Sequence, residues 1–123
     1  MSDRRFANEA AARFGLVVAQ LRARQARQAQ AEFARLRALG SQSPMIHALG
    51  ARVREAVGDA GGALVELKEG VTRFPHRRAL VYAYAAALEA LGRNAEALAF
   101  LEAEIRLAPR DPRLHELRAK GYA

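Results

Sequence analysis

Apolar residues recur along the chain at the spacing of an amphipathic helix. Leu64, Leu67 and Val71 stand at i, i+3 and i+7, which places them on one helical face. The same face returns 34 residues later, and alanine, the strongest intrinsic helix former, dominates the apolar fraction. Because β-branched residues are few and scattered, the pattern predicts an all-α chain. The expected helices cover residues 5–23, 26–39, 44–57, 60–73, 77–91, 94–107 and 112–122.

The predicted helices form an internal repeat of 34 residues. Segments 44–77 and 78–111 align without a gap, and eight aligned positions are identical. The period extends backward to 10–43 and forward to 112–123, which supplies only a first helix. The eight identical pairs are Ala51/Ala85, Glu55/Glu89, Ala56/Ala90, Gly58/Gly92, Ala63/Ala97, Leu64/Leu98, Leu67/Leu101 and Pro75/Pro109.

Several repeated residues have a physical reason to recur. Gly58 and Gly92 follow an apolar helical run, where a left-handed residue ends a helix, whereas the first repeat has Arg24 at this point. Pro75 and Pro109 lie past the second helix of each unit and cannot continue it. Small residues are expected where two helices approach closely, at Ala51, Ala63, Ala85, Ala97 and Ala119.

A helix-turn-helix unit of 34 residues, with small residues at its eighth and twentieth positions and Pro at its thirty-second, resembles the tetratricopeptide repeat (TPR). The resemblance implies that 1–123 is one domain. We expect an α-solenoid of about three repeats plus one extra C-terminal helix, in a right-handed superhelix. The chain departs from the family pattern at two aromatic positions. The usual Trp is replaced by His47 or Val81, and the usual Tyr by Arg54 or Leu88.

A TPR usually binds its partner on the concave face, which the first helices line. The face begins apolar and basic and becomes mixed in charge, which suits a peptide or a surface segment of a partner protein. Alternatively, Phe14, Val18 and Leu21 are core residues that pack against an upstream element. The candidate binding residues are Phe14, Val18, Arg22, Met45, Arg52, Glu55, Tyr82, Glu89, Glu116 and Lys120.

Motifs for catalysis or metal binding are incomplete. His115-Glu116 could begin the H-E-x-x-H helix of a zinc peptidase, but Ala119 stands where the second His is required. His47 occupies the same unit position as His115, and we expect it to be a packed histidine. The Gly-rich stretch 58–64 falls in a repeat turn, and the chain has no Cys. We therefore expect no catalytic, cofactor-binding or metal-binding residue, and no enzymatic activity in this chain.

Segment 73–123 resembles a particular TPR region, the C-terminal part of periplasmic zinc metallopeptidases of the β-barrel-assembly-enhancing protease type. The stretches FPHRRALVYAYAAAL and PRDPRLHELRAKGYA carry this resemblance, and AARFGLVVAQLRARQ is similar to the start of the same region. The resemblance implies an upstream catalytic domain that holds H-E-x-x-H and the zinc. It also implies a periplasmic location, and partners among client proteins and the outer-membrane assembly machinery.

The last predicted helix, 112–122, lacks a mate, and we expect it to expose an apolar face of Leu114, Leu117 and Tyr122. Such a face indicates a domain excised from a larger protein, and it could form a homodimer. The alternative is a free-standing TPR scaffold or co-chaperone, which would be cytoplasmic.

The charge of the chain raises a more distant alternative, a basic solenoid associated with nucleic acid. The net charge is +7, of which residues 1–43 contribute +5. We favour arginines on solvent-facing helix positions, because no aromatic residues interleave with them as a single-strand stacking surface requires. The longest apolar run, FGLVVA, is too short to span a bilayer.

Overall fold

The computed structural model describes residues 3–40 and 42–122, and within this part the chain is all-α, as predicted. The predicted bounds agree with the structure to within two residues at every helix end. The helices are α1 (Asp3–Arg22), α2 (Ala26–Ala38), α3 (Pro44–Ala56), α4 (Ala60–Arg73), α5 (Arg78–Ala90), α6 (Asn94–Leu107) and α7 (Pro112–Tyr122).

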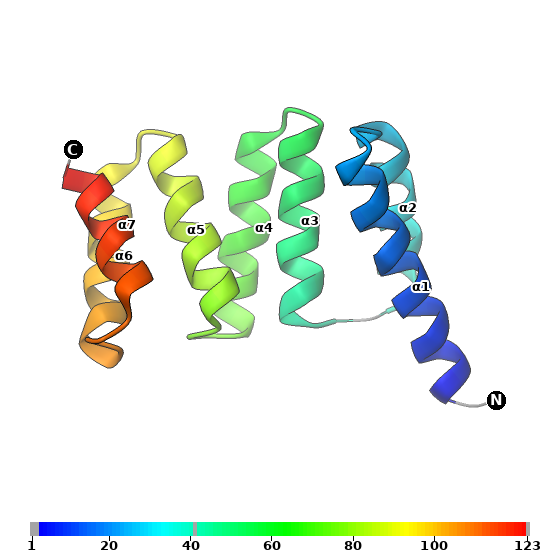
Figure 1. Cartoon of the computed structure of the whole chain (residues 1–123), viewed down its shortest axis with the longest axis horizontal. Coiled ribbons are helices and arrows are strands. Elements are labelled where there is room, and N and C mark those ends of the chain that lie inside the picture. The colour runs from blue at the N-terminus through cyan, green and yellow to red at the C-terminus, as the bar shows by residue number, and fades with distance from the viewer. Residues whose placement is uncertain (1–2, 41, 123) are drawn as a thin grey trace.

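The helices form antiparallel pairs that stand side by side in one row (Figure 1). The pairs α1–α2, α3–α4 and α5–α6 follow one another from the blue end to the yellow and orange end, and α7 packs against α5 and α6. The two termini therefore lie at opposite ends of the row. This arrangement is the helical solenoid that the repeat predicts.

The turn inside each pair has the same backbone conformation. Gly58 has φ +85° and Gly92 has φ +76°, so both adopt the predicted left-handed conformation. Arg24, one period before Gly58, also has a positive φ of 60°. In each turn the residue after the left-handed one donates its backbone N–H to a carbonyl five residues back, as in a Schellman motif. The first repeat thus keeps the same turn as the other two without their glycine.

The small residues of the repeat are buried, with one exception. Ala51, Ala63, Ala85 and Ala97 are all buried, as predicted. Ala119 is exposed, so its predicted role as a packed small residue is wrong. In the complete repeats this position is covered by the second helix of the same unit, and no described helix follows α7.

The prediction of an exposed apolar face on α7 is also wrong. Leu114 and Leu117 are only 3% and 2% exposed, because they pack into a cluster with Val81, Leu101 and Ile105 of α5 and α6. The side chain of Tyr122 lies outside the described part of the structure. The expected homodimer through this helix therefore loses the face on which it was based.

Two further helices end shortly before the predicted prolines, and α3 begins at a capping serine. Helices α4 and α6 end at Arg73 and Leu107, two residues before Pro75 and Pro109. Ser43 caps α3 by accepting a hydrogen bond from the backbone N–H of Ile46. These local signals explain why the helix bounds could be read from the sequence.

Candidate functional site

Two adjoining cavities open on the face formed by the first helices of the pairs. Their volumes are about 310 and 280 Å³, and Phe14 of α1 and Met45 of α3 line both. We call the two cavities together the apolar groove. Its lining residues are Ala10, Ala11 and Phe14 of α1, Leu36 of α2, Ser43 just before α3, Pro44, Met45, Ile46, Ala48, Leu49 and Arg52 of α3, and Ala79 of α5.

The walls of the groove are apolar and partly open to solvent. Met45 is 63% exposed, so most of its apolar side chain in the groove faces solvent. Phe14 is half-buried, because one side of its ring packs against the core and the other faces the groove. Arg52 is the one charged residue among those that line the groove. Of the predicted binding residues, the structure thus brings together Phe14, Met45 and Arg52.

Other predicted residues on the same side have different surroundings. Val18 packs against the core cluster formed by Val17, Phe33 and Leu36, so it belongs to the edge of the core. Val18 does not line the groove, so it is a core residue, as the alternative predicted. The cluster against which it packs belongs to this chain. Arg22 is exposed at the end of α1. Glu55 lines a separate hollow of about 270 Å³ between α3 and the alanine-rich face of α5.

The candidates in the second half of the chain are not gathered into the groove. The Tyr82 hydroxyl donates a hydrogen bond to Oδ2 of Asp111 at 2.6 Å, which raises the pKa of Tyr82 and lowers the pKa of Asp111. Glu116 is exposed and accepts a hydrogen bond from Arg113. Glu89 is half-buried and Lys120 is exposed. The hydroxyl of Tyr82 is therefore already engaged within the fold.

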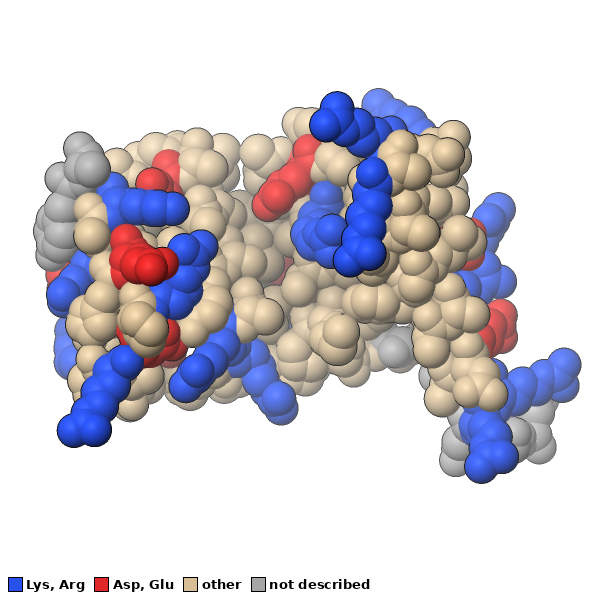
Figure 2. All heavy atoms as spheres, in the orientation of Figure 1, with Lys and Arg blue, Asp and Glu red and all other residues tan. Residues whose placement is uncertain are grey.

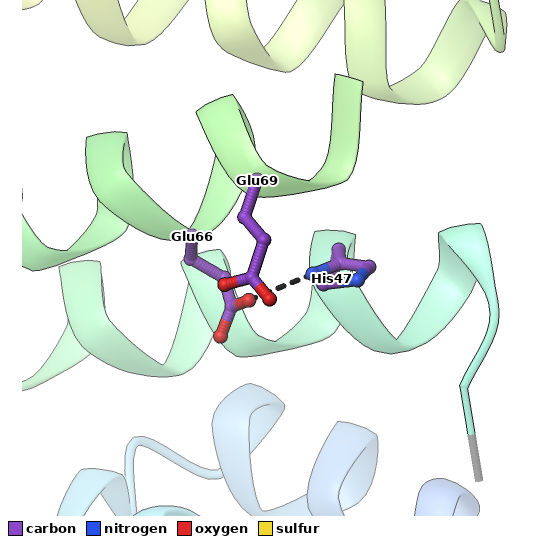
Figure 3. Close-up of side chains that lie close together, drawn as sticks. All are labelled: His47, Glu66 and Glu69. Atoms are coloured by element: carbon purple, nitrogen blue, oxygen red, sulfur yellow. Dashed lines mark hydrogen bonds and ion pairs between the residues drawn. The ribbon is translucent and has the colours of Figure 1, made fainter. Parts of the chain in front are cut away.

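A buried polar cluster lies on the opposite side of α3. His47 Nδ1 donates a hydrogen bond to Glu66 Oε2 at 2.8 Å, and the two residues are only 4% and 3% exposed (Figure 3). Arg37 of α2 donates to the other carboxylate oxygen of Glu66 at 2.6 Å. The carboxylate therefore joins the first pair of helices to the second.

This cluster could also be considered as a metal site, because potential ligand atoms of His47, Glu66 and Glu69 all lie within 4.8 Å of one another. A cation there would have to displace the Nδ1 proton of His47 and compete with the Arg37 guanidinium for Glu66. In the structure, His47 Nδ1 and both carboxylate oxygens of Glu66 are already engaged in hydrogen bonds. His47 is thus a packed histidine, as its sequence position suggested.

The comparison with protein families agrees with the architecture. The Tetratricopeptide repeat family matches residues 56–121, which is more than half of the chain. The chain belongs to the tetratricopeptide repeat family. No curated protein matched the chain. TPR units generally mediate protein–protein interaction and are typically non-catalytic.

The TPR period reveals a polar pair that the sequence comparison missed. Arg13 and Glu32 lie one period before His47 and Glu66, and Arg13 donates a hydrogen bond to the buried Glu32 at 2.7 Å. Hydrogen bonds from Arg35 and then from Arg13 lower the pKa of Glu32. The third TPR unit has two apolar residues at the equivalent positions, so aligning the second unit with the third gave no signal. The 34-residue spacing of Glu32 and Glu66 was the signal that could have found the pair.

The His115-Glu116 dipeptide of the last TPR unit has no free histidine nitrogen. His115 Nε2 lies 2.7 Å from the carbonyl oxygen of Pro109, which can only accept, so Nε2 carries the proton. Nδ1 then accepts a hydrogen bond from Arg118 at 3.2 Å. Glu116 is exposed and accepts a hydrogen bond from Arg113. None of the helices in the described part of the chain is long and apolar enough to cross a membrane.

Proposed function

We propose that the chain is a non-catalytic protein-interaction module whose apolar groove receives a segment of a partner protein. The observation that carries this proposal is the exposure of Met45, beside Phe14, in a groove on the first helices of the TPR units. Exposed apolar surface of this kind is costly in water and is stabilised when a partner covers it. TPR units generally act in this way.

The test is to pan the purified chain against a phage-displayed library of random peptides. Wild-type chain should enrich peptides, and Met45→Glu should lose that enrichment because a charge then lies in the apolar groove. Val65→Glu is the matched control, since Val65 is 68% exposed on α4 and does not line the groove. Enrichment that survives Met45→Glu, or that Val65→Glu abolishes equally, would contradict a groove-based function.

We propose further that this module serves a periplasmic zinc-dependent protease, where it docks outer-membrane assembly partners or presents client proteins. The support is the resemblance of 73–123 to the C-terminal TPR region of that class of peptidase. The zinc would lie in an upstream catalytic domain. Sequencing the gene upstream of this segment tests the proposal, which requires an H-E-x-x-H motif and a secretory signal. Their absence would favour the alternative, a free-standing TPR scaffold or co-chaperone.

A further inference from the structure

We infer that the partner segment carries a large apolar side chain with a carboxylate next to it, and that Arg52 selects this carboxylate. The inference rests on the proposed function and concerns the same groove. It is drawn from the size and apolar lining of the groove and from the side chain of Arg52, the one charged residue that lines it, which is unpaired among the described residues.

The size and lining of the groove favour apolar anchors. Each cavity is near the lower end of the roughly 300–1,000 Å³ that small-molecule pockets occupy, so it suits one or two side chains better than a whole ligand. Met45 has an unbranched, polarisable side chain that can adapt to an aromatic or branched anchor. Figure 2 shows uncharged surface over the middle of α1 and the lower part of α3, between basic side chains at the top of the view and others at the lower end of α1.

Arg52 differs from the other arginines near the groove. Arg13 is bonded to Glu32 and Glu9, Arg37 to Glu66, and Arg54 is paired with Asp59. Among the described residues, by contrast, no hydrogen bond or ion pair engages the exposed side chain of Arg52. Its guanidinium is therefore available to a ligand, and the planar fork of donors matches a carboxylate in two parallel hydrogen bonds.

Docking makes a carboxylate on the partner necessary for tight binding. An apolar segment that covers the groove removes water from Arg52, and a desolvated charge without a counter-charge weakens binding. A carboxylate beside the anchor supplies that counter-charge. The net charge of +7 also raises the local concentration of acidic segments over basic ones.

Glu55 restricts where the carboxylate can lie. It stands one helical turn after Arg52 on α3 and lines the neighbouring hollow along α5. A partner carboxylate in that hollow would be repelled. The favourable place is therefore on the side of Arg52 that faces Phe14 and Met45, immediately beside the apolar anchor.

The experiment pans a phage-displayed library in which one Phe is fixed and its neighbours are random. Wild-type chain should enrich Asp or Glu close to the Phe, and Arg52→Glu should reverse the preference to Lys or Arg. Arg110→Glu makes the same charge change in the exposed α6–α7 loop and should leave the acidic preference unchanged. A selected peptide should bind wild-type chain about tenfold or more tightly than its Asn or Gln counterpart, measured by fluorescence anisotropy.

The outcomes separate this inference from the proposed function. Peptides whose enrichment depends on Met45, but which show no acidic preference or keep it in Arg52→Glu, would overturn the inference alone. Enrichment that does not depend on Met45 would overturn both. A concentration-dependent dimer that Met45→Glu dissociates, measured by sedimentation equilibrium, would make a second copy of the chain the occupant and would also overturn the inference.

Discussion

The carboxylate of Glu66 accepts a hydrogen bond from His47 inside its own TPR unit while it holds Arg37 of the preceding unit. One buried group thus serves both the packing of a helix pair and the junction between two pairs. In the third unit the equivalent positions are held by Val81 and Phe100, and Phe100 packs edge-on against Tyr84. Equivalent positions of the repeat are therefore filled by a polar pair in the second unit and by apolar residues in the third.

Replacing Glu66 by Ala should lower the free energy of unfolding by about 2 kcal/mol or more, because His47 then keeps a buried donor without an acceptor. Urea unfolding followed by circular dichroism measures the change. Glu69→Ala, on the exposed side of the same helix, is the control and should stay within about 0.5 kcal/mol. Equal effects of the two substitutions would mean that the buried hydrogen bonds contribute nothing specific.

Replacing Arg24 by Gly should stabilise the chain by about 0.5–1 kcal/mol. A left-handed backbone costs an L-residue about 1–2 kcal/mol, and the greater flexibility of unfolded glycine offsets only part of this gain. The thermal midpoint is the measurement. Arg27→Gly, the same change inside α2, should instead cost about 1 kcal/mol. A loss of stability in both variants would show that Arg24 is not strained.

Replacing Gly92 by Val should destabilise the fold by roughly 1 kcal/mol or more. No atom lies close enough to clash with an added Cβ, so the cost comes from the positive φ alone. Ala99→Val, at an exposed position of α6, should cost only about 0.5 kcal/mol from lower helix propensity. Chemical denaturation of the two variants checks the difference, and a neutral Gly92→Val would contradict the requirement for glycine in this turn.

The Tyr82–Asp111 hydrogen bond should make stability depend on pH at both ends of the scale. The pKa of Asp111 is lowered by the bond from Tyr82, so its stabilisation is present above the unfolded value of about 4 and is lost as the pH falls through the folded pKa. The pKa of Tyr82 is raised, so its stabilisation is present below the unfolded value of about 10 and is lost as the pH rises through the folded pKa.

Tyr82→Phe tests this dependence. The urea midpoint of the variant should lie below that of wild-type chain by a constant amount between about pH 5 and 9, and the difference should shrink outside that range. Other carboxylates titrate equally in both proteins and cancel in the comparison. A difference that stays constant down to about pH 2 would mean that ionised Asp111 does not contribute through Tyr82.

The purified chain should bind no stoichiometric zinc and should not cleave casein. Both nitrogens of His115 are engaged, and the His47–Glu66 hydrogen bond would have to break for a metal to enter. Elemental analysis after dialysis against zinc gives the metal content. One zinc per chain that is lost in His47→Ala would locate a site at the buried cluster and contradict this expectation.

Local sequence signals were enough to predict most of the fold. Left-handed glycines, prolines after helices and apolar spacing act within a few residues, so the helix bounds and the left-handed turns could be predicted. Contacts between distant helices could not. Nothing near Tyr82 indicates that Asp111, 29 residues away, takes its hydroxyl. The burial of Leu114 and Leu117 likewise depends on their packing against residues of α5 and α6.

The candidate binding face was predicted as one continuous surface, but of its residues Phe14, Met45 and Arg52 line the apolar groove, while Glu55 and Tyr82 line separate hollows. Unit positions identify which helix face a residue occupies, but they do not give the distance between neighbouring helices. The groove exists because Phe14 and Met45 bound a space between α1 and α3 that the small side chains Ala10, Ala48 and Ala79 leave unfilled.

The positions of His47 and Glu66 hold polar pairs in the first two units and apolar residues in the third. In a repeat protein each unit contacts only its neighbours, so local stabilities need not be lost together. The first two units place a buried carboxylate at these positions, whereas the third unit has an aromatic contact there, so the same position is stabilised by different interactions. Loss of the Glu66 carboxylate in Glu66→Ala should therefore speed amide hydrogen exchange in α1 to α4 more than in α5 to α7, so that the weakened chain opens first at its N-terminal end.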